Sequence, residues 1–279
     1  MYDLFLKNSQ ASTIKTVCDI NKVNTKLVIK KCIFASILSH FMSDVLVIIP
    51  TYNEKENIEL IINAVFEQDK EFHVLVVDDN SPDKTGDIVK SLMTKFPEKL
   101  FIEERKGKNG LGTAYIHGFK WALNKDYQYI IEMDADFSHN PKDLVRLYNA
   151  CHIDGTDLSV GSRYSQGVNV VNWSMKRVLL SYFASKYVRF ITGIPIHDTT
   201  AGFVCYKRKV LETIKLDKIR FVGYAFQIEM KFKAWKHGFN LKEVSVIFTD
   251  RTLGESKMSG SIVYEALLGV IKMRFRGLR

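Results

Sequence analysis

The sequence lacks any long apolar run and any cysteine pattern. These absences argue against a membrane-spanning protein, a zinc-knuckle protein and a disulfide-stabilised protein. The four cysteines of the 279 residues are scattered, at Cys18, Cys32, Cys151 and Cys205, and no two form a Cys-x-x-Cys pair. Neither a zinc knuckle nor a disulfide framework is therefore expected, and a reducing setting fits this cysteine usage. The longest apolar stretches fall short of the roughly 20 residues that a membrane-spanning helix needs. In "KLVIKKCIFASILSHF", for example, Lys30 and Lys31 interrupt the run.

Glycine and proline are also unevenly used. Residues 1–41 contain neither, and they match nothing that follows, whereas a strand pattern begins just after Met42. We interpret 1–41 as an N-terminal appendage that need not be part of the working protein. A short amphipathic docking helix is the alternative. No linker rich in Pro, Gly or Ser interrupts the rest, so 42–279 is predicted to be one domain that ends in a basic amphipathic segment.

Acidic residues are outnumbered, with 31 Asp and Glu against 40 Lys and Arg, which gives a formal net charge of +9. A basic chain suits an anionic partner such as a nucleotide, a lipid phosphate or an anionic membrane. No cluster of basic and aromatic residues resembles a nucleic-acid-binding motif, so we do not expect nucleic acid as a partner. Hydrophobic residues at 46% and charged residues at 25% are ordinary values for a folded globular protein.

Apolar runs and segments with helical spacing alternate along the chain. The runs predict strands at 45–50, 73–79, 100–105 and 127–134, and the helical spacing predicts helices at 56–68, 85–96 and 113–125. The second half is less regular, with strands predicted in 157–164 and 241–251 and helices at 175–193 and 224–238. This alternation predicts an α/β fold with a mostly parallel, Rossmann-like sheet and helices on both faces. Ligands of such sheets bind beyond the carboxyl ends of the strands.

Two aspartates follow the predicted strand 127–134, in the stretch "YIIEMDADFSHNP". If the strand continues, its alternation places Asp134, Asp136 and Ser138 on the same side. Two carboxylates this close repel each other unless a cation lies between them, and such oxygen ligands suit Mg²⁺ or Mn²⁺. The alternative is that both aspartates cap the next helix, with Pro141 near its start.

The glycine-rich stretch "GKNGLGTAYIHG" does not fit a dinucleotide-binding fingerprint. Gly110 and Gly112 supply Gly-x-Gly, but Tyr115 stands where the third glycine belongs. A Rossmann oxidoreductase is therefore not predicted. A glycine turn at the start of a helix could still face an anion.

Three stretches stand in order at successive predicted strand ends, namely "IIPTYNEKENI" (48–58), "VVDDNSPDKTGDI" (76–88) and "MDADFSHNP" (133–141). They are accompanied by "GLGTAYIHGF", "VGSRY", "DTTAGF", "GYAFQIEM" and "DRTLGESKM". From about Val45 to about Lys257 the sequence thus resembles the family 2 glycosyltransferases of the GT-A fold. Within that family it is most similar to the dolichol-phosphate mannosyltransferases, the polyprenyl-phosphate mannose synthases.

The resemblance implies roles for particular residues. It implies nucleotide contacts by Pro50, Tyr52, Glu54, Val77 and Asp79, and binding of the metal and the diphosphate by Asp134, Ala135 and Asp136. Ser138, the third candidate metal ligand, stands where some relatives have Gln. A hydroxyl is a weaker ligand than an amide carbonyl, so a water is expected to complete the coordination shell. The basic positions around the donor and acceptor phosphates correspond to Arg163, Arg177, Arg251 and Lys257. Of all these residues, Asp136, Arg163, Arg177 and Arg251 are the expected catalytic residues.

Some neighbouring residues are expected to have structural roles. Asp78 should orient its turn, and Asn53 should cap the following helix. His139 should be a capping or surface histidine, and a supporting role behind the metal motif is the alternative. Asp198, in "HDTTAGF", is expected to shape the acceptor loop.

The resemblance implies transfer of mannose from GDP-mannose to a polyprenyl phosphate, with inversion. One alternative is a related transferase that uses UDP-glucose or another UDP-sugar. Another, of a different class, is an inactive scaffold subunit, and the presence of Asp134, Asp136, Arg251 and Lys257 argues against it. The implied location is cytoplasmic and peripheral, at the cytoplasmic face of a membrane. The basic segments 175–193 and 262–279 or a membrane-embedded partner subunit would provide the attachment.

Overall fold

The computed structural model describes residues 43–223, 225–250 and 268–275. The predicted appendage, 1–41, lies outside this part of the chain. The helices and strands named below belong to one compact unit, Asp44–Arg279.

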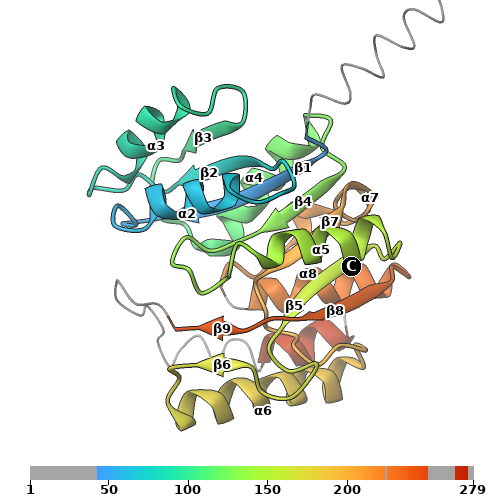
Figure 1. The fold of residues 1–279 in the computed structure, drawn as a ribbon. Helices are drawn as coiled ribbons and strands as arrows, with labels where there is room; N and C mark the ends of the chain where they lie inside the picture. The colour runs from blue at the N-terminus through green and yellow to red at the C-terminus, as the bar shows by residue number, and fades with distance from the viewer. Residues whose placement is uncertain (1–42, 224, 251–267, 276–279) are drawn as a thin grey trace, which may run out of the picture. The chain divides into compact units, whose positions relative to one another are not determined.

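The unit is built on a seven-stranded sheet with the strand order β3-β2-β1-β4-β7-β5-β8 (Figure 1). Its strands are β1 (Val45–Thr51), β2 (His73–Asp78), β3 (Leu100–Glu104), β4 (Tyr129–Glu132), β5 (Leu158–Ser162), β7 (Val204–Lys207) and β8 (Leu241–Ser245). Neighbours pair in parallel, except that β7 runs antiparallel to both β4 and β5. The prediction of a mostly parallel sheet is confirmed.

Helices cover both faces of the sheet, as predicted. The helices α2 (Ile58–Phe66), α3 (Thr85–Met93) and α5 (Asp143–His152) lie on one face, and α4 (Leu111–Leu123), α7 (Arg208–Thr213) and α8 (Ala225–Lys236) lie on the other. Alternation along β1 separates the two cores: Val47 packs with the first set and Ile48 with the second. A short 3₁₀ helix, η1 (Leu216–Lys218), connects α7 toward α8.

A smaller layer adjoins the sheet. The strands β6 (Val170–Val171) and β9 (Phe248–Thr249) pair in parallel beside the long helix α6 (Met175–Thr192). The Ser174 side chain accepts a hydrogen bond at the start of α6, and Gly193, with φ +74°, ends it, so this helix matches the prediction to within one residue. The helical segment 268–275 packs against α6 and α8 through a cluster of Val188, Ile228, Phe232, Val270 and Met273.

Strand directions place the polar turns at one edge of the sheet. The carboxyl ends of β2, β1 and β4 are neighbours, and β5 points the same way because it is antiparallel to β7, which is antiparallel to β4. Since β7 runs in the opposite direction, the segment that precedes it also enters at this edge. On one side of β1 the next strands in the sheet are β2 and β3, and on the other side the sheet continues with β4. α/β sheets bind ligands at the carboxyl ends of the strands beside such a switch point.

Candidate active site

Asp78, the last residue of β2, ties the turns after β1 and β2 together. One carboxylate oxygen accepts hydrogen bonds from the hydroxyls of Thr51 at 2.8 Å and Ser81 at 2.6 Å, and the other accepts one from the Ser81 backbone N–H at 2.9 Å. The Asp79 backbone N–H donates to the Thr51 carbonyl at 3.0 Å. Asp78 thus shapes its turn, in agreement with the expectation.

Asp79, the expected nucleotide contact, is held by an arginine that the sequence analysis did not single out. Arg105 donates from Nε to one carboxylate oxygen at 2.5 Å and from Nη2 to the other at 2.7 Å. Its Nη1 donates to the Thr113 hydroxyl at 2.8 Å. This fork fixes the orientation of the carboxylate. The only sequence signal was the position of Arg105 at the end of a predicted strand.

The other residues expected at the nucleotide lie around the same strand ends. Pro50 and Val77 are register partners on β1 and β2. The ring of Tyr52 faces the Lys108 ammonium, which lies 4.8 Å from the ring centroid. The Glu54 carboxylate accepts a hydrogen bond from the Asn57 amide at 3.0 Å. The structure therefore brings the predicted set together at one place.

The prediction that Asn53 caps the following helix is wrong. Asn57 occupies the N-cap position of α2, whereas Asn53 adopts a left-handed conformation with φ +58°. Its backbone N–H donates to the Ser81 hydroxyl at 3.0 Å. Asn53 therefore forms part of the turn after β1, where its left-handed backbone conformation is possible because asparagine tolerates positive φ better than most residues do.

The glycine turn before α4 is occupied by protein contacts. The Gly112 backbone N–H donates to the Val222 carbonyl at 2.8 Å. A Cβ on Gly112 would lie only 2.7 Å from the buried ring of Phe226. This glycine therefore permits close packing of α4 against α8, and its N–H does not face an anion.

The two aspartates of the Asp-x-Asp sequence lie in a turn and not on a strand, because β4 ends at Glu132. The prediction that strand alternation places Asp134, Asp136 and Ser138 on one side is therefore wrong. The turn itself bends the chain, with Phe137 at φ +58°, and the Ser138 backbone N–H donates to Asp136 at 3.1 Å. Asp136, Ser138 and Ala135 are buried, whereas the Asp134 side chain is 36% exposed.

Two buried rings orient Asp134. The Tyr115 hydroxyl donates to its carboxylate at 3.1 Å, and the His139 Nδ1 accepts from its backbone N–H at 3.0 Å. Burial and the nearby Asp134 charge raise the pKa of Tyr115 well above its ordinary value, so it remains a donor. Burial lowers the pKa of His139 despite the aspartates, so its ring is neutral near pH 7. The expectation of a surface histidine was wrong, because His139 stacks on Phe203 inside the protein.

The turn offers hard oxygen ligands, namely the Asp134 and Asp136 carboxylates and the Ser138 hydroxyl. Within the described residues, no three His, Cys, Asp or Glu side chains gather into a ready-made metal site. Mg²⁺ characteristically binds through one or two carboxylates and completes its shell with phosphate oxygens and water. The donor set therefore fits Mg²⁺ or Mn²⁺ bound together with a phosphorylated ligand.

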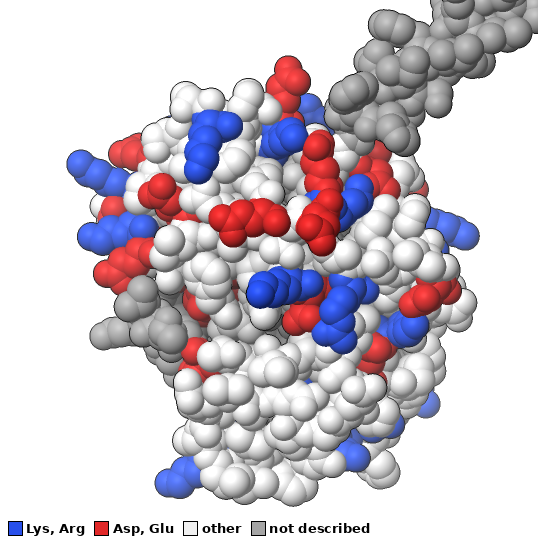
Figure 2. Space-filling model, in the orientation of Figure 1, with Lys and Arg blue, Asp and Glu red and all other residues white. Residues whose placement is uncertain are grey.

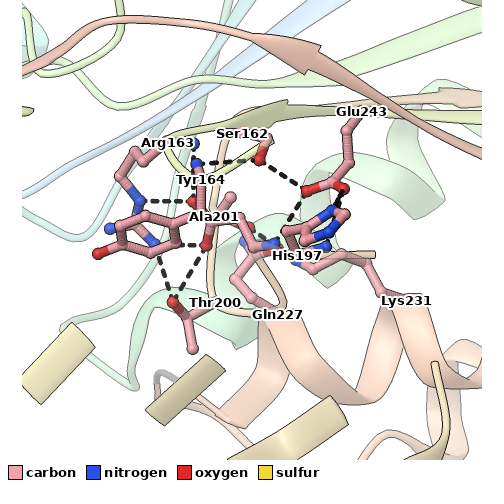
Figure 3. A network of polar contacts seen from close by, with 10 residues as sticks. Ser162, Arg163, Tyr164, His197, Thr200, Ala201, Gln227, Lys231 and Glu243 are labelled. Carbon is pink, nitrogen blue, oxygen red and sulfur yellow. Dashed lines mark hydrogen bonds and ion pairs between the residues drawn. The ribbon is translucent and has the colours of Figure 1, made fainter. Parts of the chain in front are cut away.

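Arg163 follows β5 and lies in a buried network with the segment that precedes β7 (Figure 3). Its Nε and Nη2 donate to the two carboxylate oxygens of Asp198 at 2.6 Å each, and Nη2 also donates to the Thr200 hydroxyl at 2.8 Å. Burial alone would raise the pKa of Asp198, but Arg163 more than offsets this and the pKa is lowered. The pair is therefore fully ionised at neutral pH.

Arg177, on the first turn of α6, is the more accessible of the two described arginines expected at phosphates. Its guanidinium lies 4.0 Å from the ring centroid of Trp173, and it forms an ion pair with Asp250 at 2.7 Å. The Arg163 guanidinium lies 5.5 Å from the same ring. Both cations thus lie near one tryptophan ring. The two other expected residues, Arg251 and Lys257, lie outside the described residues.

A buried acid and a buried base lie behind this edge, and neither was predicted from the sequence. Glu132 ends β4 and Lys231 lies on α8, and neither side chain is exposed. Burial raises the pKa of Glu132 to about 8, although Lys231 opposes the rise. Burial likewise lowers the pKa of Lys231 to about 8, against the influence of Glu132. Glu132 lies in an apolar run, and Lys231 is one of several polar residues along α8, so the sequence did not mark either as a buried polar group.

Comparison with known sequences identifies the class of protein that this fold and site define. Residues 46–215 match the profile of Glycosyl transferase family 2. This match covers more than half of the chain, and the chain belongs to glycosyl transferase family 2. It is a glycosyltransferase of the α/β GT-A type.

Two bacterial proteins share more than 40% of their aligned residues with this chain. Polyprenol monophosphomannose synthase of Mycolicibacterium smegmatis is 47% identical over 232 residues, which span 83% of this chain and 87% of that protein. Undecaprenyl-phosphate mannosyltransferase of Micrococcus luteus is 43% identical over 239 residues, which span 84% and 97%. A mannosyltransferase from Pyrobaculum calidifontis, solved with GDP-Man and Mn²⁺, shares the fold with a TM-score of 0.56 at 20% identity. That match covers 85% of this chain and 65% of the solved one.

Proposed function

We propose that this protein transfers mannose from GDP-mannose to the phosphate of a polyprenyl, dolichyl-type lipid, with inversion at the anomeric carbon. The observation that carries the proposal is the 43–47% identity to two enzymes named for polyprenyl-phosphate mannose synthesis, over more than four fifths of the chain. The arrangement of the fold supports it, because the residues expected at the nucleotide and the described arginines expected at the phosphates lie along one sheet edge.

The donor would bind at the ends of β1, β2 and β4. The Tyr52 ring can stack on a base, and the Asp79 carboxylate, held by Arg105, can accept a proton from the base or the ribose. Asp134 and Asp136 would hold a divalent cation, Mg²⁺ or Mn²⁺, which supplies positive charge for the diphosphate when bound. Tyr115 and His139 keep Asp134 in place, so the carboxylate does not reorganise during the reaction.

The acceptor needs positioning more than it needs deprotonation. The second pKa of a phosphate monoester is about 6, so the attacking oxygen is already anionic near neutral pH. No general base is therefore assigned. Arg177 and Arg163, which both lie near Trp173, would place the acceptor phosphate in line, while Arg251 and Lys257 would stabilise the leaving GDP.

We also propose that the protein works at the cytoplasmic face of a membrane as a peripheral protein. Of the helices that the structure describes, none is both long enough and apolar enough to cross a membrane. Large apolar side chains are exposed on α6 and on the adjoining segment 268–275, namely Met175, Leu179, Leu180, Phe183, Phe190, Leu268, Ile271 and Phe275. Lysines and arginines border this largely uncharged surface (Figure 2), an arrangement that suits an anionic interface.

A panel of sugar nucleotides incubated with polyprenyl phosphate and Mg²⁺ tests the enzymatic proposal, with the lipid-linked product identified by mass. Product from GDP-mannose alone is expected. Product from UDP-glucose but not from GDP-mannose would replace the proposal by the glucosyl alternative. No product from any donor, with or without Mn²⁺, would leave the scaffold alternative.

Sedimentation with anionic liposomes tests the membrane proposal. Each basic residue near an anionic surface contributes about 1 kcal/mol, so replacing Lys272 and Arg274 by Gln should weaken binding roughly thirty-fold. A matched control replaces Lys209 and Lys215, which are also exposed but lie on and after α7. Equal losses in both variants, or no binding by the wild type, would refute this attachment.

A further inference from the structure

We propose that the segment 197–201 is a fixed arm of the acceptor site and that Lys231 is a positioning residue for Arg163, acting through this arm. The inference rests on the proposed function, because it assigns the arm to the acceptor side of that reaction. Figure 3 shows the arm between strand β8, which carries Glu243, and helix α8, which carries Lys231.

Glu243 anchors the beginning of the arm. Its two carboxylate oxygens accept hydrogen bonds from the backbone N–H groups of His197 at 2.8 Å and Asp198 at 2.9 Å. The Ser162 hydroxyl donates to the same carboxylate at 2.6 Å. Because Ser162 immediately precedes Arg163, this anchor joins the arm to the end of β5.

The middle of the arm carries the groups that hold Arg163. The Asp198 carboxylate accepts from the guanidinium through two nitrogens and also from the Arg163 backbone N–H at 3.0 Å. The Thr200 hydroxyl accepts a further bond from Nη2. The position of the guanidinium therefore follows the position of the arm.

Lys231 fixes the far end. Its ammonium donates to the Ala201 carbonyl at 2.6 Å and contacts the Gln227 side-chain oxygen at 3.3 Å, and the residue is fully buried. A bond from an ammonium to a backbone carbonyl is charge-assisted and short, so it resists displacement of the arm. Ala201 directly follows Thr200, and a shift at this end would move one of the groups that hold the guanidinium.

Stability alone does not explain a buried lysine at this position. Both carboxylate oxygens of Glu132 accept no hydrogen bond from any described residue, and Lys231 forms no direct ion pair with it. Buried charges in such an arrangement are often replaceable by well-packed apolar side chains without loss of stability. The specific bond to Ala201 gives the lysine a role that an apolar side chain cannot fill.

The same helix provides a matched control. Lys233 is also buried on α8, and its ammonium also donates to a backbone carbonyl, that of Lys218, at 3.0 Å. This carbonyl belongs to η1 and not to the arm. Lys231→Met and Lys233→Met therefore each remove a bond from a buried ammonium to a backbone carbonyl, in two different segments. Lys233→Met also removes an ion pair with Glu229 at 3.0 Å, so it is the more severe test of stability alone.

The test compares the wild type with Lys231→Met, Lys233→Met and the double variant Lys231→Met/Glu132→Gln. The readouts are KM for polyprenyl phosphate, KM for GDP-mannose, and amide hydrogen exchange of 197–203. We expect Lys231→Met to raise the acceptor KM on the order of tenfold or more, to change the donor KM little, and to speed exchange in the arm. Lys233→Met should leave the acceptor KM and the exchange of the arm near their wild-type values.

The double variant separates positioning from stability. It replaces the Glu132 carboxyl by a neutral amide, so any cost of an unpaired buried carboxyl group is removed and stability should recover, while the bond to Ala201 stays lost and the acceptor KM stays high. Recovery of the acceptor KM together with stability, or an equal defect in Lys233→Met, would overturn the inference. If the wild type makes no lipid-linked product, the proposed function fails instead. Hydrogen exchange in the Lys231→Met and Lys233→Met variants then decides whether Lys231 fixes the arm.

Discussion

Replacing Arg105 by methionine should lower the free energy of unfolding by about 3–5 kcal/mol, the usual cost of removing one partner from a buried ion pair. The Arg105 and Asp79 side chains are only 10% and 8% exposed. Without the arginine, the Asp79 carboxylate loses both of its charged hydrogen bonds, and the Thr113 hydroxyl loses one neighbour. Methionine restores most of the packing volume, so the loss reports mainly on the charge.

Lys90→Met is the matched control. Lys90 forms an ion pair of similar length, 2.7 Å, with Glu104 on β3, but the two side chains are 47% and 49% exposed. Exposed pairs contribute about 0–1 kcal/mol because water and salt screen them. The two variants therefore compare one interaction type at two degrees of burial.

Thermal and denaturant unfolding measure the difference. For a folded unit of this size, about 1 kcal/mol shifts the melting temperature by roughly 2–4 °C, so Arg105→Met should melt roughly 6–20 °C below the wild type. A further change of Asp79 to Asn should recover part of the loss, since no unpaired charge remains. A shift in Arg105→Met no larger than that in Lys90→Met would refute the assignment of a tightly held, buried Asp79.

Other expected outcomes concern the metal, the arm and the appendage. Asp136→Ala should abolish transfer while retaining the far-UV circular dichroism of the fold, and EDTA should inactivate the wild type reversibly; full activity in EDTA would exclude the metal. The pKa of Asp198 is lower in the folded protein than its ordinary value of 3.8, so its contribution to stability is present above that value and is lost as the pH falls through the folded-state pKa. The free energy of unfolding of the wild type should therefore fall more steeply with acid than that of Asp198→Asn, and parallel acid titrations of the two proteins would contradict this linkage. Deletion of 1–41 should leave transfer and melting temperature nearly unchanged, and a large loss of either would show that the segment belongs to the working protein.

The sequence predicted the first half of the fold well because each buried strand there is a continuous apolar run followed by a polar turn. β1 and β2 match their predicted ranges to within one residue. Two strands were missed for a local reason: β7 has only four residues and β6 has two, too few for a periodic signal. The strand predicted in 241–251 is divided in the structure into β8 and the two-residue β9. These short strands depend on pairing with distant neighbours and not on their own composition.

The sequence predicted those candidate site residues that directly follow a strand, because an apolar run that ends in polar residues is visible in a single sequence. Tyr52, Asp79 and Asp134 stand directly after apolar runs, and the resemblance to a family named the remaining expected residues. The partners that orient these residues were not visible, because Arg105 is 26 positions from Asp79 and Asp198 is 35 positions from Arg163. Such pairs are created by the sheet order, and a single sequence does not contain that order.

The reversed strand β7 has a consequence for engineering acceptor choice. Neighbouring strands lie about 4.8 Å apart, so one intervening strand separates the ends of β4 and β5 by roughly 10 Å. The chain before Asp143 carries the expected donor residues of the described region, and the chain after Asp157 carries Arg163, Arg177 and the arm. The two substrates would thus be served mainly by consecutive stretches of polypeptide, with β7 as the spacer between them, although Arg251 and Lys257 of the second stretch are also expected to contact the donor. Chimaeras joined in α5 should combine the donor preference of one parent with the acceptor preference of the other, provided that both parents keep a strand of the same length at β7.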